Sequence, residues 1–360
     1  LLVAAPLVTS IRFEGIAVVA AAALLLAWRR RWRLALGMAA LGALPVALYA
    51  VVSLSHGWYA LPTSVLVKRA PVSLADPLSF IRGNWIIQLL RVPLLSFRLS
   101  AIILLAFPVI AAALMALNRR AGERGAAQGA LALLFLVAAA QATLARGGLR
   151  YELYLVVLLA YALARQPWPR PGRRAAAWLR LAAVGAVAFL LLGRGLEALA
   201  EGHLAMMNIH AHHGTRGRFL RESYPGASVA MTDIGYANYA ADLRLLDLAA
   251  LGSREVMAQR LAGVARSPES LQRLAESHAV EIAILYERNF VARRDGRLVN
   301  LLPPHWVKVG AWTITTPNVV LTDPTLSLYA TSEGEAARLA AALRAFAPSL
   351  PPTVRTTFDR

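Results

Sequence analysis

Long apolar runs rich in Ala and Leu dominate the first 200 residues of the chain. They lack the period-2 alternation of barrel strands, so the pattern predicts helices. A bilayer core takes about 20 apolar residues in helical form. We therefore expect about six membrane spans, near residues 14–28, 34–54, 99–117, 128–145, 149–165 and 178–197.

After residue 200 the apolar segments become short and polar segments separate them. Strands are predicted at 228–232, 243–248, 281–286, 306–314 and 318–322. Helices are predicted at 211–224, 236–241, 253–264, 268–278 and 332–346. Strands that alternate with helices indicate a small, partly parallel sheet. The expected fold class is an α-helical polytopic membrane domain, residues 1–200, followed by a small soluble α/β domain, residues 201–360.

The charge distribution supports this division. Residues 1–200 hold 21 Lys/Arg and 5 Asp/Glu, whereas residues 201–360 hold 17 and 15. The basic residues of the first part lie in short loops between apolar runs, which favours a membrane protein and disfavours nucleic-acid binding. The chain has no cysteine, which excludes disulfides, thiolate catalysis and cysteine-based metal sites.

Three of the short loops hold 12 basic residues and fall on one side of the expected bundle. Loops of this kind are typically cytoplasmic. The loop 55–98 and the C-terminal domain then lie on the opposite side, and we expect a bacterial inner-membrane protein with an extracytoplasmic C-terminal domain. The 12 residues are Arg29, Arg30, Arg31, Arg33, Arg119, Arg120, Arg124, Arg165, Arg170, Arg173, Arg174 and Arg180.

The loop 55–98 is basic although it lies on the outer side. Its apolar residues between 77 and 92 recur at spacings of three and four, which predicts an amphipathic helix on the membrane surface. Lys68, Arg69 and Arg82 either meet lipid head groups or form a cationic site for the phosphate of a lipid-linked ligand. Asp76 is either the cap of this helix or a local candidate base.

Arg12 and Glu14 lie at the outer end of the first expected span. They form either an interfacial pair or part of a polar cavity at membrane depth. Because this segment and the loop 55–98 share one side, two basic elements are expected to converge there.

Polar residues of the C-terminal domain leave further alternatives open. Asp233 follows a predicted strand and precedes a helix, so it is either a helix cap or a functional carboxylate. His210, His212 and His213 suggest a metal site, and the spacing places His210 and His213 on one helical face. No carboxylate partner accompanies them, and a solvated helix start is the favoured interpretation.

Several segments, taken in order, resemble a known family. Residues 10–15 (SIRFEG) are similar to a Thr-Arg-Pro-Glu-Gly segment, and residues 59–68 (YALPTSVLVK) to a Leu-Pro-Asn-(Ser/Thr) loop closed by a lysine. Residues 150–154 (RYELY) resemble an Arg-Tyr motif that opens a late span. Residues 229–235 with 245–252 resemble a strand–turn–strand pattern of the tail. Together they resemble the later part of GT-C-type membrane glycosyltransferases, family 39-like.

The resemblance implies a cell-envelope enzyme that transfers a sugar from a polyprenyl-phosphate donor to a glycan, lipid or protein acceptor at the outer membrane face. The implied phosphate-binding residues are Arg12, Lys68 and Arg69, with Arg82 and Arg150. Glu14 and Asp233 are implied as supporting residues. No cofactor is specified, and the requirement for a divalent metal stays open.

The sequence departs from the family pattern at three points. Phe13 stands where the family has Pro, and Thr63 where it often has Asn. The acidic base of the first external loop has no counterpart. Because the chain starts at Leu1 inside an apolar stretch, we expect that base upstream of Leu1.

A second class of function stays open beside the transferase: a non-catalytic membrane scaffold or assembly factor whose outer domain binds a partner. Transport is disfavoured because the expected spans carry few ionisable residues, mainly Glu152.

Overall fold

The computed structural model describes residues 2–13, 15–68, 95–120, 125–144, 153–166, 174–264, 266–294 and 297–359. The chain divides into two compact units, Leu1–Ala198 and Leu199–Arg360.

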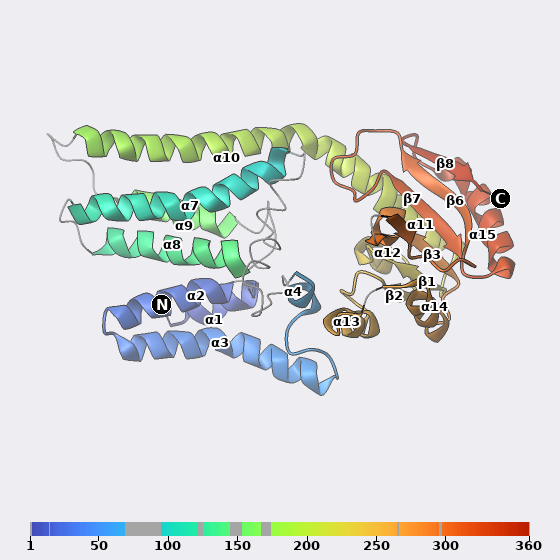
Figure 1. Ribbon diagram of the computed structural model, residues 1–360, viewed down its shortest axis with the longest axis horizontal. Coiled ribbons are helices and arrows are strands. Elements are labelled where there is room, and N and C mark those ends of the chain that lie inside the picture. Colours follow the sequence, from blue (N-terminus) through green and yellow to red (C-terminus); the bar gives the residue numbers. More distant parts are fainter. Residues whose placement is uncertain are drawn as a thin grey trace. The chain divides into compact units, whose positions relative to one another are not determined.

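The first unit is helical (Figure 1). Helix α2 packs against α3 and α8, and α8 also packs against α7 and α9. Phe107, Leu131 and Leu134 are fully buried in a core to which α2, α7, α8 and α9 contribute. The helices are α1 (Ala4–Ile11), α2 (Gly15–Trp28), α3 (Trp32–Ser55), α4 (Thr63–Lys68), α7 (Leu95–Arg120), α8 (Ala126–Leu144), α9 (Leu153–Ala164) and the first part of α10 (Arg174–Ile209).

The expectation of a polytopic membrane domain with about six spans is wrong. Among the residues that the structure describes, one helix, α3, is long and apolar enough to cross a membrane, with a mean hydropathy of 2.0. Four further apolar helical stretches have only 10–17 residues. A single such helix is weak evidence for a span, because core helices and signal sequences meet the same criteria.

Helix length and burial explain the correction. Helix α2 has 14 residues and ends at Trp28, before a turn in which Arg30 has φ of 59°. At 1.5 Å per residue it rises about 21 Å, short of a bilayer core of about 30 Å. Helix α9 has 12 residues and rises about 18 Å. Several apolar side chains that suggested lipid contact are instead buried between helices.

The second unit combines helices with a mixed sheet (Figure 1). Its helices after α10 are η2 (His210–Gly214, a π-helix), α11 (Thr215–Ser223), α12 (Gly235–Ala240), α13 (Arg254–Leu261), α14 (Pro268–Ser277), η3 (Glu287–Phe290), α15 (Glu333–Phe346) and η4 (Ala347–Ser349). Its strands are β1 (Ser228–Met231), β2 (Arg244–Asp247), β3 (Ile282–Leu285), β4 (Val291–Arg294), β5 (Arg297–Asn300), β6 (Val307–Ile314), β7 (Thr325–Ala330) and β8 (Val354–Phe358).

Six strands form one sheet in the order β2-β1-β3-β7-β6-β8. β1 pairs in parallel with β2 and β3, in the register Val229 with Leu245 and Val229 with Ile282. β7, β6 and β8 add antiparallel strands. All four residues of β1 and of β3 are buried, as expected for parallel strands covered on both faces. β4 and β5 form a separate two-stranded sheet.

Local sequence explains where several of these elements begin and end. Ser267 caps α14 in a reciprocal capping box with Ser270, and Pro268 occupies the first turn. Ser332 caps α15 by accepting from the Glu335 amide. Beyond α11, Gly226 has φ of 73°, a conformation that favours glycine, so the helix stops where the sequence predicted.

The predicted strand at 318–322 is wrong. Asn318 instead closes a loop, with its Oδ1 accepting from the Val320 and Leu321 amides. The strand that pairs between β3 and β6 is β7, a few residues later.

Aromatic side chains form the core beneath α11 and α15. Phe219 lies edge-on to Trp312, with ring centroids 5.3 Å apart, and to Phe346 at the same distance. All three are buried. Because Phe219 belongs to α11 and Trp312 to β6, this cluster fixes the position of α11 on the sheet.

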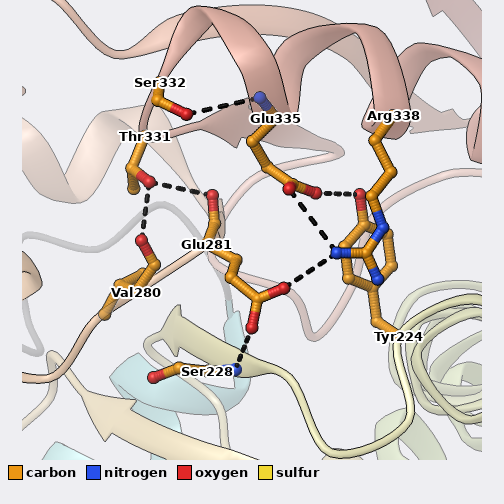
Figure 2. A network of polar contacts seen from close by, with 8 residues as sticks. All are labelled: Tyr224, Ser228, Val280, Glu281, Thr331, Ser332, Glu335 and Arg338. Carbon is orange, nitrogen blue, oxygen red and sulfur yellow. Dashed lines mark hydrogen bonds and ion pairs between the residues drawn. The ribbon is translucent and has the colours of Figure 1, made fainter.

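A polar network secures the amino-terminal edge of β1 and β3 (Figure 2). The Glu281 carboxylate accepts from the Ser228 amide at 3.1 Å and pairs with Arg338 at 2.9 Å. Tyr224 donates to Glu335 at 2.7 Å, and the Arg338 guanidinium lies 4.6 Å from the centroid of the Tyr224 ring. The network thereby ties α15 to the first residues of two parallel strands.

Candidate functional site

The carboxyl ends of β1 and β3 meet at the opposite edge of the sheet. β2 and β3 lie on opposite sides of β1 in the sheet. The chain therefore runs from β1 to its neighbour β2 and then crosses over β1 to reach β3. A strand order of 2-1-3 has its topological switch point between β1 and β3, where open α/β sheets bind ligands. Asp233 follows β1 there, and Tyr286 follows β3.

The π-helix η2 and the first turn of α11 bring His212, His213 and Arg216 to this edge. The π-helix interrupts the helix between α10 and α11, and π-helical turns are frequent at functional sites. His212 Nδ1 hydrogen-bonds the Tyr286 hydroxyl at 3.2 Å. On the next turn, Arg216 donates to His213 Nδ1 at 3.0 Å and to the backbone carbonyl of Asp233.

Arg216 is a buried cation without a carboxylate partner. Only 1% of the residue is exposed, and in the part of the chain that the structure describes it forms no ion pair. Burial lowers the pKa of its guanidinium, and the charges of Tyr286 and Asp233 act in the opposite direction. Because burying a charge is costly unless it is paired, this arrangement favours an anion nearby.

Other polar atoms around Arg216 also lack partners. Arg216 Nε and the hydroxyls of Thr215 and Thr232 are buried and make no hydrogen bond with the described residues. Such atoms are rare in folded proteins and are commonly satisfied by a bound water or ligand.

The pKa values of both His212 and His213 are lowered from the ordinary value of histidine. Burial, together with the neighbouring His213 and Arg216, lowers the pKa of His212 to about 4. Burial and the charge of Arg216 also lower the pKa of His213, while Asp233 raises it. The ring nitrogens of this pair therefore act as neutral hydrogen-bonding groups.

A cavity of about 540 Å³ lies against the π-helix and shares His213 and Thr215 with this cluster. Its lining combines apolar and basic side chains, and no acidic residue contributes to it within the described part of the chain. The lining residues are Ala205, Met206, Ile209, His210, His213, Gly214, Thr215, Arg218, Arg221 and Tyr236. The cavity therefore suits a ligand that is partly apolar and partly anionic.

Arg218 and Arg221 differ in how they are held. Arg218 donates to the Ser349 carbonyl and stacks over Phe346, with its guanidinium carbon 5.1 Å from the ring centroid. Arg221 is exposed at the end of α11. Arg221 is therefore the cation of the lining that can be replaced with the least effect on packing.

The phosphate-binding residues implied by the resemblance lie elsewhere. Arg12 is half-buried in the first unit, where it follows α1. The backbone of Lys68 ends α4, and nothing is described of its side chain. The remaining sequence candidates, Glu14, Arg69, Asp76, Arg82 and Arg150, lie outside the described residues.

The helix-cap interpretation of Asp233 is wrong. Ile234 is the N-cap residue of α12, and no side chain caps this helix. The Asp233 side chain is exposed, and its backbone carbonyl accepts from Arg216. The carbonyl, rather than the carboxylate, makes the contact seen at the switch point.

The expectation of a solvated helix start at the histidines is also wrong. The helix continues from α10 through η2 into α11, and His212 is fully buried. The residues that the structure describes contain no cluster of three or more His, Cys, Asp or Glu that could hold a metal ion.

Sequence reasoning missed Arg216, Tyr286 and Tyr236. One signal was available: residues 210–221 (HAHHGTRGRFLR) hold six basic or imidazole side chains and no acidic one. Tyr286 lies 74 residues after His212 in the sequence, so only the tertiary fold brings the two together.

Comparison with known proteins gives one match. Residues 206–329 match the model of a family described as a domain of unknown function, DUF8728. This segment contains the π-helix, Arg216, Asp233 and Tyr286. No curated protein and no solved structure matches the chain.

Proposed function

We propose that this chain takes part in sugar transfer from a polyprenyl-phosphate donor, and that the cavity beside the π-helix binds the donor's phosphate together with the first part of its lipid. The observation that carries the proposal is the cavity lining. It places His210, Arg218 and Arg221 around walls formed by Met206, Ile209 and Tyr236. A lipid phosphate has the same combination of anionic and apolar surface.

The reaction class comes from the sequence resemblance. The acceptor oxygen forms a bond to the anomeric carbon while the bond from that carbon to the phosphate oxygen breaks. The lipid phosphate leaves with the electron pair, and a carboxylate takes the acceptor's proton. Cations at the phosphate favour its departure because negative charge develops there. The role of this chain in the proposal is donor binding, and no described residue is assigned as the base.

Calorimetric titration of the full chain with farnesyl phosphate tests donor binding. We expect farnesyl phosphate to bind at least about tenfold more tightly than farnesol, because the phosphate contacts the cations. Arg221→Ala should weaken the binding of farnesyl phosphate by about tenfold. Arg273→Ala is the matched control, an exposed arginine on α14 outside the cavity lining, and should bind as the wild type does.

Equal affinity for farnesol and farnesyl phosphate, or the same loss in both arginine variants, would overturn the proposal. A partner-binding scaffold would then be the better account, since Leu199, Met206 and Tyr239 are more than 60% exposed on this unit.

A further inference from the structure

The contact between Arg216 and His213 determines which ring nitrogen of His213 carries the proton. A guanidinium has donors only, so the 3.0 Å contact requires a lone pair on His213 Nδ1. A neutral imidazole with a free lone pair on Nδ1 carries its proton on Nε2. Arg216 therefore holds His213 as a hydrogen-bond donor at Nε2.

The second ring nitrogen of His213 is available to a ligand. His213 lines the cavity, and Arg216 contacts its Nδ1 and not its Nε2. Nε2 makes no hydrogen bond with the described residues. Thr215, whose buried hydroxyl also lacks a partner there, lines the same cavity.

We infer that His213, held as a neutral donor by buried Arg216, binds an anionic oxygen of a phosphate in the cavity. The inference deepens the proposed function and rests on it for the choice of phosphate. Arg216 acts through His213 and contributes positive potential, so it is a positioning residue. Arg218, Arg221 and His210 surround the same ligand.

This arrangement also excludes a second role. A neutral His213 whose Nδ1 already accepts from Arg216 has no free lone pair, because Nε2 carries the proton. It therefore cannot remove a proton from an acceptor hydroxyl in this state. The geometry assigns His213 to recognition of the phosphate and leaves the general base elsewhere.

A purely structural pair would look different. In the network of Figure 2, the cation Arg338 is matched by the carboxylates of Glu281 and Glu335. At Arg216 the contacts are a neutral ring and a carbonyl. Four buried polar atoms of this cluster have no partner among the described residues: Arg216 Nε, His212 Nε2 and the hydroxyls of Thr215 and Thr232. The unmatched positive charge favours an anion nearby, and His213 and Thr215 connect this cluster to the cavity.

Nitrogen-15 NMR of selectively labelled histidine in the full chain tests the tautomer. The signals of His213 are assigned by their loss in His213→Gln. We expect an unprotonated Nδ1 and a protonated Nε2 at pH 7, and a change at Nε2 when farnesyl phosphate is added. A proton on Nδ1, or an Nε2 signal that does not respond to the ligand, overturns the inference.

Binding to variants gives an independent measurement. His213→Leu should bind farnesyl phosphate at least about tenfold more weakly, because the donor is lost. His213→Gln should stay within about threefold of the wild type, since its amide can accept from Arg216 and donate to the ligand. Equal affinities of the Leu variant and the wild type overturn the inference, and the Gln variant shows whether a loss reflects the hydrogen bond or misfolding.

Inorganic phosphate separates this inference from the proposed function. If inorganic phosphate binds as tightly as farnesyl phosphate and both depend on His213, the inference that His213 binds a phosphate is supported. The proposal that the ligand is a lipid-linked donor is then overturned. If only farnesyl phosphate binds and depends on His213, both stand. If farnesyl phosphate binds equally to the wild type and to His213→Leu, the proposed lipid-phosphate donor is retained. The inference that His213 binds its phosphate is then overturned.

Discussion

The two edges of the parallel strands carry polar clusters that differ in how their charges are balanced. At the amino-terminal edge, Arg338 pairs with two glutamates, and one of these also accepts from the Ser228 amide. At the carboxyl edge, Arg216 is buried with a neutral histidine and a backbone carbonyl. Both clusters lie in the same unit and attach a helix to β1 and β3.

The difference separates a cluster that stabilises the fold from one that is suited to a ligand. No side chain of the amino-terminal network has a buried polar atom without a partner in the described residues, whereas Thr215, Arg216 and Thr232 each have one at the carboxyl edge. Removing one partner from a fully hydrogen-bonded network destabilises the folded protein. A buried charge without a carboxylate partner is itself destabilising, so its removal does not lower stability in the same way. The two clusters should therefore respond to mutation in opposite directions.

The largest difference is expected from acid. His212 has its pKa lowered to about 4 from an ordinary 6.5, so between these values the unfolded chain binds a proton that the folded chain does not. Stability from this group is complete above pH 6.5 and is lost as the pH falls toward 4, by about 3 kcal/mol at pH 4. Urea unfolding at pH 7 and pH 4 measures it.

The His212→Leu variant isolates this contribution, because other groups also titrate in acid. Its loss of stability between pH 7 and pH 4 should be smaller than that of the wild type by about 3 kcal/mol. An equal loss in both proteins would show that His212 is accessible to protons in the folded state.

Glu281→Ala tests the amino-terminal network. The change leaves the Ser228 amide without its acceptor and removes a partner of Arg338, so the free energy of unfolding should fall by about 2 kcal/mol. Urea unfolding followed by circular dichroism gives the value. Glu276→Ala, an exposed glutamate on α14, is the control and should change it by less than about 0.5 kcal/mol.

Arg216→Met tests the carboxyl edge. Replacing the unpaired buried cation with an apolar side chain of similar length should leave the free energy of unfolding unchanged or raise it by about 1 kcal/mol. Affinity for farnesyl phosphate should fall in the same variant, as measured by calorimetry. A destabilisation as large as that of Glu281→Ala would show that Arg216 stabilises the fold, as the amino-terminal network does.

The smallest effect is expected from Arg338→Met. Half of the Arg338 side chain is exposed, so water and salt screen its ion pairs. The free energy of unfolding should fall by less than about 1 kcal/mol, and the loss should shrink in 1 M salt. A loss equal to that of Glu281→Ala would contradict this prediction. It would show that the Arg338 cation contributes as much to stability as the carboxylate that accepts from the Ser228 amide.

Much of the second unit could be predicted because its signals are local. The helix over α14 follows from Ser267 and Pro268, the stop after α11 from Gly226, and the buried strands β1 and β3 from short apolar runs. Each signal acts within a few residues, through a cap, a backbone conformation or a continuous apolar stretch.

The first unit shows where such reasoning fails. The apolar runs predict six spans, yet Phe107, Leu131 and Leu134 are buried against other helices. An apolar residue in a helix is compatible with either lipid or a protein core, and only tertiary packing distinguishes the two. The family resemblance implies a site at Arg12 and the loop 55–98, whereas the cavity is lined by residues between 205 and 236.

By itself, the sequence determined the local elements of the second unit, the absence of cysteine chemistry and the basic run at residues 210–221. Only the tertiary structure decided that this run passes through a π-helix, that Arg216 is buried without a carboxylate, and that Tyr286 reaches His212. The reason is that burial and partner choice depend on strand order and helix packing, which join residues far apart along the chain.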